Sequence, residues 1–497
     1  MLLLGLDVGT TGVKCVAFDE RGVIRARAYR MYDAELPSGG RRELAPGEIW
    51  RCTSQAIAAV AAAIQGEAAV LSVSSFGEAF VMIDRAGKEI GPAMVFTDRR
   101  GENEQEEIMG LLPEEEVARI CGLVPKGQYS ASKMLYLKRH EPAMYENTAF
   151  FLLIADYIYY KLCGERYTDY SLAARTQLFD VEKKMWSGRM LSCFGIPSEK
   201  LSSPVPGGTA IGRVSKKVAE ELGLSPDTQL VTGGHDQICC ALGAGMLPET
   251  PVCSMGTSEC ITPILSRRLP AEVTLRHSFS SEPFFEADTY CTLLYNACAG
   301  LLIDWFFEAF APQARKDGRP DYAFLESKAP RDPTRIMVLP YLLGSGTPYV
   351  DPRARLCIWG LDAGARGETV FKACIEGLSL DQRLNLSLLE DSGVCVSGLV
   401  AVGGGSKSAF WLQTKANVLQ RDVLIPECNE AGALGCAILC ASATGLYPDI
   451  RAAAREMCRI SHTVSPDMQY AQAYAEMSEL YKGLYHDCKR INDSISG

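Results

Sequence analysis

The sequence predicts an α/β protein built from two related domains that face each other, and three observations lead to that prediction. The chain has 497 residues, which is too long for one ordinary hydrophobic core. LGLDVGTTGVKCVAF, which begins at residue 4, reads as an apolar strand, a loop of glycine and threonine, and a second apolar strand. The same order recurs in PVCSMGTSECITPIL, which begins at residue 251. This recurrence indicates an internally duplicated architecture.

The first half of the chain alternates predicted strands and helices. Three strands, in LLLGLDV, GVKCVAFD and GVIRARAY, are joined by the turns TTG and ERG. A helix is predicted over 47–66, followed by buried strands in VLSVSSFG (70–77) and in AFVMID. The charge-rich stretch 102–147 has a helical pattern, and 149–200 is predicted as further helix. QLVTGGHDQICCALGAGML (229–247) then gives a strand, a double glycine, an aspartate and a helix of small residues.

After the hairpin that begins at residue 251, the second half also alternates predicted strands, loops and helices. We expect a long helix over about 294–310, the loop LPYLLGSGTPYVDPRAR (339–355) and a helix over about 367–391. LVAVGGGSKSAFWLQTKANVL (399–419) reads as a strand, three glycines and a helix that opens on Ser406. The stretch GAGMLPETP interrupts the pattern near 243–250. The predicted domains are therefore residues 1–245 and 246–497.

Composition excludes several classes of function. The net charge of -10 argues against a nucleic-acid partner, although glycine loops and helix N-termini still hold small anions. No signal peptide is visible, and the apolar run AIAAVAAAI (56–64) is too short to cross a bilayer. The 19 cysteines include no Cys-x-x-Cys pair and sit mostly among apolar residues, so we interpret them as reduced core thiols. We expect a cytoplasmic protein that binds neither nucleic acid nor membrane.

The glycine-containing loops have the chemistry of phosphate-binding turns. A turn such as DVGTTG exposes successive backbone N–H groups and two hydroxyls, which form a concave nest for phosphate oxygens. Asp7 beside it could hold Mg²⁺, which favours carboxylate, water and phosphate oxygens. MGTS (255–258) offers the same cradle, and GGGSK lets the chain approach a planar ligand at a helix N-terminus. A plain tight turn and a turn cap at Asp7 are the alternatives, while P-loop and Rossmann motifs are absent from the sequence.

Taken together, these stretches resemble the FGGY carbohydrate kinases, a family within the actin-like ATPase superfamily. The resemblance runs from LGLDVGTTGVK to AGALGCAILCASATGLY (431–447). It includes DYIYYKLCGERYTDYSLAARTQLFD (156–180), GGHDQICCALGAG, GTSE (256–259) and GGGSKSAFWLQTKANVL. It implies two ribonuclease-H-like (actin-like ATPase) domains, each a mixed β-sheet flanked by helices, with ATP, Mg²⁺ and a sugar in the cleft between them. Homodimers are frequent in that family, so a second copy of the chain is a candidate partner.

The resemblance also implies roles for individual residues. It makes Asp7 the magnesium-associated carboxylate and Asp236 the catalytic base. The residues that it places at the nucleotide are, on the phosphates, Thr10, Thr11, Lys14, Gly256, Thr257 and Ser258, and on the adenosine, Gly404, Gly405 and Ser408.

Asp236 has a second, independent rationale as the base. Phosphoryl transfer to an alcohol requires a group that takes the hydroxyl proton, and a carboxylate within hydrogen-bond reach does so. Asp236 follows a strand and a double glycine, so it can project into a cleft, although it could instead cap the helix QICCALGAG.

Sugar contacts are expected from polar side chains near the base. The family resemblance points to Gly77 and Glu78 in SSFGEAF, and Gln237 and Asp98 are further candidates because carboxylates and amides can bind neighbouring hydroxyls. An ion pair with Arg99 or Arg100 is an equally good interpretation of Asp98.

The predicted activity is ATP-dependent phosphorylation of a hydroxyl on a ketose, polyol or sugar acid, as in a xylulokinase-like carbohydrate kinase. Xylulokinases usually carry a Gly-Gln-Met-His type stretch where this chain has Ser75, Phe76, Gly77 and Glu78, so no single sugar follows. The alternatives are an ATP-driven conformational switch, as in actin-like and chaperone relatives, and a sugar sensor without turnover.

Overall fold

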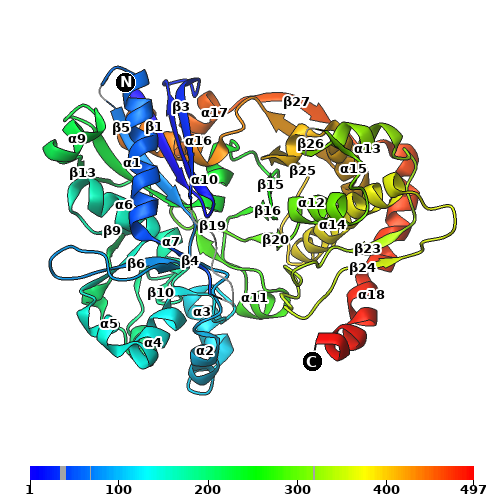
Figure 1. Ribbon diagram of the computed structural model, residues 1–497, viewed down its shortest axis with the longest axis horizontal. Coiled ribbons are helices and arrows are strands. Elements are labelled where there is room, and N and C mark those ends of the chain that lie inside the picture. The colour runs from blue at the N-terminus through cyan, green and yellow to red at the C-terminus, as the bar shows by residue number, and fades with distance from the viewer. Residues whose placement is uncertain (34–40, 68, 317–318, 497) are drawn as a thin grey trace.

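Two six-stranded mixed sheets form the framework of the molecule (Figure 1). The computed structural model describes residues 1–33, 41–67, 69–316 and 319–496. The first sheet runs in the order β13 (Ala210–Arg213), β14 (Gln229–His235), β5 (Ala69–Ser75), β1 (Leu2–Val8), β2 (Gly12–Phe18) and β3 (Ile24–Met31). The second runs in the order β20 (Leu294–Asn296), β16 (Glu259–Thr262), β15 (Val252–Met255), β25 (Gly398–Val402), β26 (Asp422–Pro426) and β27 (Ile460–Val464).

The two sheets share one pattern of strand directions. Read from β3, the first sheet has two antiparallel pairings, two parallel pairings and an antiparallel edge. Read from β20, the second sheet has the same sequence of pairings. The hairpins β1–β2 and β15–β16 occupy equivalent places, so the internal duplication predicted from the sequence is confirmed.

Successive side chains of β1 point to opposite faces of the sheet, so they face different helices. Leu4, Leu6 and Val8 belong to the core that also contains residues of helix α1 (Pro46–Ala63). Leu3 lies in the core on the opposite face, with helix α16 (Ala431–Ala443). Gly5 shares that face, and a Cβ there would lie 2.0 Å from the carbonyl oxygen of Ala433. Because Asp7 continues the same face, its side chain lies beside the first turn of α16.

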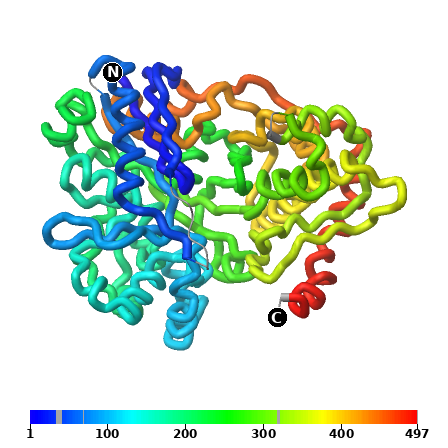
Figure 2. The backbone as a smooth tube through the Cα atoms, in the orientation of Figure 1, coloured from blue at the N-terminus to red at the C-terminus, as the bar shows by residue number. Residues whose placement is uncertain are grey.

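Helices α10 (Asp236–Gly243) and α16 pack against each other between the two sheets. A single core joins Val70 of the first sheet, Ile238 of α10, Ile438 of α16 and Val400 of the second sheet. Close contact depends on glycine, since a Cβ at Gly243 would lie 1.9 Å from a carbonyl oxygen of α16. Figure 2 shows an orange segment of the chain, which precedes the red C-terminal end, beside the blue N-terminal strands. Although α16 follows the predicted boundary at residues 245 and 246, it covers the first sheet.

The region 102–147 is helical, as predicted, but 149–200 is not helix throughout. The first stretch contains α2 (Glu102–Met109), α3 (Glu114–Cys121), α4 (Ser130–His140) and α5 (Pro142–Asn147). The second contains α6 (Ile154–Cys163), α7 (Tyr170–Ala174) and α8 (Gly188–Phe194), with strands β8 (Phe150–Leu153), β9 (Tyr167–Asp169), β10 (Phe179–Asp180) and β11 (Met185–Trp186). The prediction failed at β8 because its partner, β6 (Phe80–Ile83), lies far earlier in the chain.

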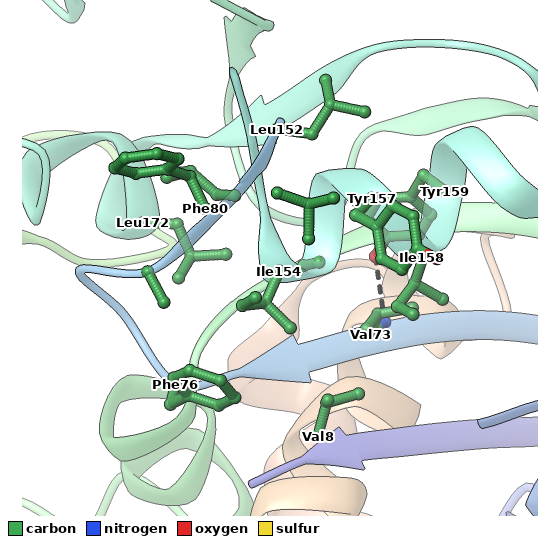
Figure 3. Close-up of a cluster of buried hydrophobic side chains, with 14 of the residues drawn as sticks. Val8, Val73, Phe76, Phe80, Leu152, Ile154, Tyr157, Ile158, Tyr159 and Leu172 are labelled. Atoms are coloured by element: carbon green, nitrogen blue, oxygen red, sulfur yellow. Dashed lines mark hydrogen bonds between the residues drawn. The ribbon is translucent and has the colours of Figure 1, made fainter. Parts of the chain in front are cut away.

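Figure 3 shows the core beneath this region, where α6 packs against β5. Tyr157 and Tyr159 are fully buried there among Phe80, Leu152 and Ile154. The dashed line joins the Tyr159 hydroxyl to the backbone nitrogen of Val73 at 2.9 Å. This side chain ties α6 to the strands that carry the candidate site.

Two boundaries in the second half differ from prediction. The helix expected over 294–310 is α12 (Gly300–Ala309), because residues 294–296 form β20 and pair with β16. The helix expected to open on Ser406 is α15 (Ala409–Leu419), preceded by a 3-10 turn at 405–407. The helix α14 (Gly367–Glu390) agrees with prediction, and α18 (Ala471–Ser496) ends the described chain. In the part of the chain that the structure describes, none of the helices has the length and apolar character needed to cross a membrane.

Candidate active site

The two predicted phosphate loops are tight turns at the ends of equivalent hairpins. In the first, Gly9 N donates to Gly12 O at 2.9 Å, leaving Thr10 and Thr11 at the tip. In the second, Gly256 N donates to Ser258 O at 2.9 Å. The start of α12 supports this second turn, because Gly300 N donates to Gly256 O at 3.0 Å. Both turns present small polar residues to the space between the sheets.

Asp7 lies at the base of the first hairpin with its carboxylate held from two sides. The Ser74 hydroxyl donates to Asp7 Oδ1 at 3.2 Å, and a Cβ on Gly432 would lie 3.3 Å from Asp7 Cγ. Burial raises the pKa of Asp7, and the Lys14 ammonium opposes that increase. Lys14 itself donates to Glu430 at 2.6 Å. Asp7, Thr11, Lys14 and Glu430 line an open cavity of about 580 Å³.

The carboxylate of Asp7 fits a role in holding Mg²⁺. Among the described residues, no group of three or more acidic, histidine or cysteine side chains could hold a metal by itself. Mg²⁺ characteristically takes one or two carboxylates and completes its shell with water and phosphate oxygens. A single carboxylate that opens onto a cavity beside a predicted phosphate-binding turn has that donor chemistry.

A bulge in β14 positions Asp236. The pairing of β14 with β5 shifts register between Thr232 and Gly234. Gly233 is required there, since a Cβ would lie 2.1 Å from Val73 O. The backbone nitrogen of Gly233 donates to the Tyr159 hydroxyl at 2.9 Å. Without this hydrogen bond, the bulge would leave that buried N–H group without a partner. Asp236 follows the strand as the first residue of α10.

The electrostatics of Asp236 are those of a carboxyl that retains its proton. Burial raises its pKa to about 8, and the negative charge of Asp7 adds to the increase. The backbone nitrogen of Gln237 donates to Asp236 Oδ1 at 2.6 Å, which acts in the opposite direction. His235 Nε2 lies 3.3 Å from the same oxygen, and burial lowers the pKa of that imidazole well below its usual value. Asp7 and Asp236 therefore lie within electrostatic reach of each other.

One cavity of about 300 Å³ brings the predicted elements together. Thr10 of the first hairpin and Ser258 of the second hairpin both line it, as does Asp236. The other predicted residues in its lining are Gly77, Glu78 and Gln237. Gln237 Oε1 is buried and has no hydrogen-bond partner among the described residues.

A buried arginine that the sequence analysis missed organises the wall of this cavity. Arg175 pairs with Glu78, and it also donates to Glu282 at 2.8 Å. Glu78 adopts a left-handed conformation with φ 62°, which is uncommon outside glycine and is often found at functional sites. Gly77 leaves room for this arrangement, because a Cβ there would lie 3.0 Å from Arg175 Cγ. No local signal could reveal a pairing between residues about 100 positions apart.

Asp98 lies in an ion pair, the alternative that the sequence left open. Its Oδ2 accepts from Arg100 at 2.7 Å and from the backbone nitrogen of Arg42 at 2.8 Å. Burial opposes ionisation, but these hydrogen bonds hold the pKa of Asp98 below its usual value. Asp98 is absent from the described lining of the cavity, whereas Phe96 of the same loop is present.

The residues predicted at the adenosine follow β25 and lie against the second hairpin. A Cβ at Gly405 would lie 3.0 Å from Met255 Cβ, at the end of β15. Ser408, rather than Ser406, caps helix α15 by accepting from Trp411 N at 2.9 Å. The Ser408 hydroxyl also donates to Glu326 at 2.7 Å. Gly404 and Gly405 thus form a turn beside the phosphate loop and before a capped helix N-terminus.

Comparisons with known proteins identify the family and the fold of the chain. Residues 2–243 match the FGGY family of carbohydrate kinases, N-terminal domain, and residues 252–444 match its C-terminal domain. The xylulose kinase of Bacillus subtilis (strain 168) is 27% identical over 503 residues, covering 99% of this chain and 98% of the relative. The autoinducer-2 kinase of Enterobacter sp. (strain 638) is 28% identical over 526 residues, covering 99% and 95%. The solved gluconate kinase from Lactobacillus acidophilus has a TM-score of 0.90 at 22% identity, covering 100% of this chain and 99% of that one, and supports the fold alone.

Proposed function

Because the chain belongs to the FGGY family of carbohydrate kinases, we propose that it transfers the γ-phosphoryl group of ATP to a hydroxyl group of a ketose, polyol or sugar acid. The observation that carries this proposal is the shared cavity. Thr10 and Ser258, one from each phosphate hairpin, line the same space as the carboxyl group of Asp236. A phosphate chain held by both hairpins would lie next to a hydroxyl bound at Asp236.

Asp236 acts as the general base in this proposal. Its carboxylate takes the proton of the acceptor hydroxyl while the new oxygen–phosphorus bond forms and the bond to the ADP leaving oxygen breaks. The backbone N–H groups of the two hairpins, together with Lys14, hold phosphate oxygens in line with that hydroxyl. Mg²⁺ held at Asp7 would supply charge neutralisation for the phosphates. It would also offset the negative charge that raises the pKa of Asp236.

The cavity wall suits a ligand with several hydroxyl groups. Gln237 Oε1, His235 Nδ1 and Arg175 Nε are buried without partners among the described residues, and all three residues line the cavity. Buried polar atoms are normally satisfied, so their grouping at one site favours a polar occupant. The apolar faces of Phe76, Phe96 and Tyr295 complete the lining.

A substrate screen with coupled ADP detection tests the proposal. Pentuloses, hexuloses, polyols and aldonates are offered with ATP and Mg²⁺, and at least one class should stimulate ADP release strongly. Asp236→Asn should retain nucleotide binding and lose about 10²–10⁴-fold in transfer rate, since that is the usual contribution of a general base. Asp227→Asn, which alters a surface ion pair with Arg213, serves as the matched control.

Two outcomes would count against the proposal. Near-full activity of Asp236→Asn would refute the role of that residue as the base. Hydrolysis of ATP that no acceptor stimulates would instead favour an ATP-driven conformational switch.

A further inference from the structure

Lys126 is a cation in the cavity of about 300 Å³, and it has no carboxylate partner among the described residues. It lies in the segment between α3 and α4 and lines the same cavity as Asp236. Within the described parts of the chain, its Nζ contacts the carbonyl oxygen of Val350 at 3.5 Å, and no carboxylate lies within ion-pair distance. The negative charge of Asp351 raises the pKa of Lys126, which burial lowers. The Asp351 carboxylate, however, accepts a hydrogen bond from the Tyr485 hydroxyl at 2.8 Å.

The other cation in the cavity lining is already paired with carboxylates. Arg175 forms ion pairs with both Glu78 and Glu282, so its positive charge is balanced without an anionic ligand. Lys126 differs from Arg175 in this respect. Burial removes water from its ammonium group and lowers its pKa to about 8, and no bound carboxylate offsets that effect. Burying a charge is unfavourable unless the charge is paired. The cavity therefore has one positive position that a ligand can complete.

Lys126 and Asp236 have different charged neighbours within the cavity lining. Asp7, Glu78 and Arg175 are the charged groups that act on Asp236, whereas Asp351 acts on Lys126. The negative charges of Asp7 and Glu78 would repel an anionic group from the neighbourhood of Asp236, and Lys126 would attract it. A ligand with an anionic end would thus be oriented with its opposite end toward the base.

The backbone facing Lys126 is strained. Val350 has φ 47°, a left-handed conformation that a β-branched residue rarely adopts. Such outliers concentrate at ligand clamps and active sites. Val350 also lines the cavity and comes from the second half of the chain, whereas Lys126 comes from the first half. The lysine and this strained loop therefore meet in the cavity wall.

We propose that Lys126 binds a carboxylate of the acceptor, and that the acceptor is a sugar acid such as an aldonate. This inference rests on the proposed kinase function and narrows its substrate class. The carboxylate pairs with Lys126, and a hydroxyl at the far end of the carbon chain lies at Asp236. Neutral polyols of the same length lack the ion pair and bind more weakly.

Matched acceptors and variants test this subsite. Five- and six-carbon aldonates are compared with alditols of equal length and with sugar monophosphates, using ADP release by the full-length protein at pH 7. The wild type should show a KM for an aldonate at least tenfold below that of the matching alditol. Lys126→Met should raise the aldonate KM about 10- to 100-fold with little change in kcat, while leaving alditol kinetics within about twofold. Lys126→Arg should restore part of the loss, and Lys217→Met, at an exposed position, should have no effect.

Other results would contradict either the proposed carboxylate subsite or the proposed kinase function. A preference for neutral sugars, or equal effects of Lys126→Met on aldonates and alditols, would overturn the subsite and leave the kinase intact. A preference for sugar monophosphates would overturn the assignment to a carboxylate. Absence of transfer to every acceptor would contradict the proposed function. Calorimetric binding of an aldonate to wild type and to Lys126→Met, without nucleotide, then decides the subsite alone.

Discussion

Replacing Asp236 by asparagine should stabilise the protein at alkaline pH, although it removes the proposed base. The carboxyl has a usual pKa of 3.8 and a pKa of about 8 in the folded protein. The folded state therefore binds one more proton than the unfolded state between those values. In that range the free energy of unfolding falls by about 1.4 kcal/mol for each unit of rising pH. The asparagine side chain of the variant carries no charge and escapes this loss.

The magnitude follows from the surroundings of the side chain. The full range between the two pKa values corresponds to about 6 kcal/mol. Because 29% of the Asp236 side chain is exposed, solvent screens part of that penalty, so about 6 kcal/mol is the upper limit of the expected gain. Asparagine keeps the oxygen that accepts from Gln237 N, so the start of α10 should be preserved.

Thermal unfolding of the nucleotide-free protein from pH 5 to pH 8.5 measures the effect. The melting temperatures of wild type and Asp236→Asn should be close at pH 5 and should separate as the pH rises, with the variant higher. Asp98→Asn is an opposite control, because its partners hold the pKa of Asp98 low and the variant should lose stability at neutral pH. A gap between Asp236→Asn and wild type that stays constant with pH would refute the reasoning.

Four further predictions concern catalysis and packing. The logarithm of kcat/KM should rise with a slope of one as the pH approaches about 8, since the proposed base Asp236 must lose its proton, and a flat pH–rate profile from 6 to 8 would contradict this. The corresponding rise in kcat should lie at lower pH, because Mg²⁺ held at Asp7, as proposed, would offset the charge of that carboxylate. Gly77→Ala should raise the acceptor KM about tenfold, or about 1.4 kcal/mol, because the new Cβ would lie 3.0 Å from Arg175 Cγ. Gly5→Ala should lower the free energy of unfolding by about 3 kcal/mol or more, since its Cβ would lie 2.0 Å from a carbonyl oxygen of α16.

Matched glycine variants separate crowding from a general effect of the substitution. Gly47→Ala and Gly367→Ala add a Cβ that meets no atom within 4 Å. Both should leave acceptor KM and unfolding midpoint nearly unchanged in the same kinetic and denaturation assays. If Gly77→Ala and Gly5→Ala behave like these controls, the close contacts do not limit the site or the core.

The parts of the fold that local patterns encode were predictable. The hairpins β1–β2 and β15–β16 close over a few residues, so alternation and turn chemistry reveal them and their duplication. Strand β20 was missed because its three residues precede an apolar helix and pair with β16 far back in the sequence. Short apolar stretches of this kind take their identity from distant partners.

The candidate site divides in the same way. Asp7 and Asp236 stand beside glycine turns at strand ends, and the turns make them visible in the sequence. Lys126 and Arg175 have no such signal in the sequence. Arg175 is distinguished by its ion pair with the distant Glu282, and Lys126 by its contact with a carbonyl oxygen instead of a carboxylate. From the sequence, Asp98 is a candidate ligand-binding carboxylate, yet in the structure it forms an ion pair with Arg100.

The placement of α16 has a consequence for dissecting the molecule. A fragment ending at residue 245 would leave bare the face of the first sheet that carries Leu3 and Gly5, together with one side of α10. Exposed apolar surface of this kind promotes aggregation, so we do not expect the N-terminal half to be stable as a separate fragment. A Cβ on Gly432 of the same helix would lie 3.3 Å from Asp7 Cγ, so any displacement of α16 would also change the surroundings of that carboxylate.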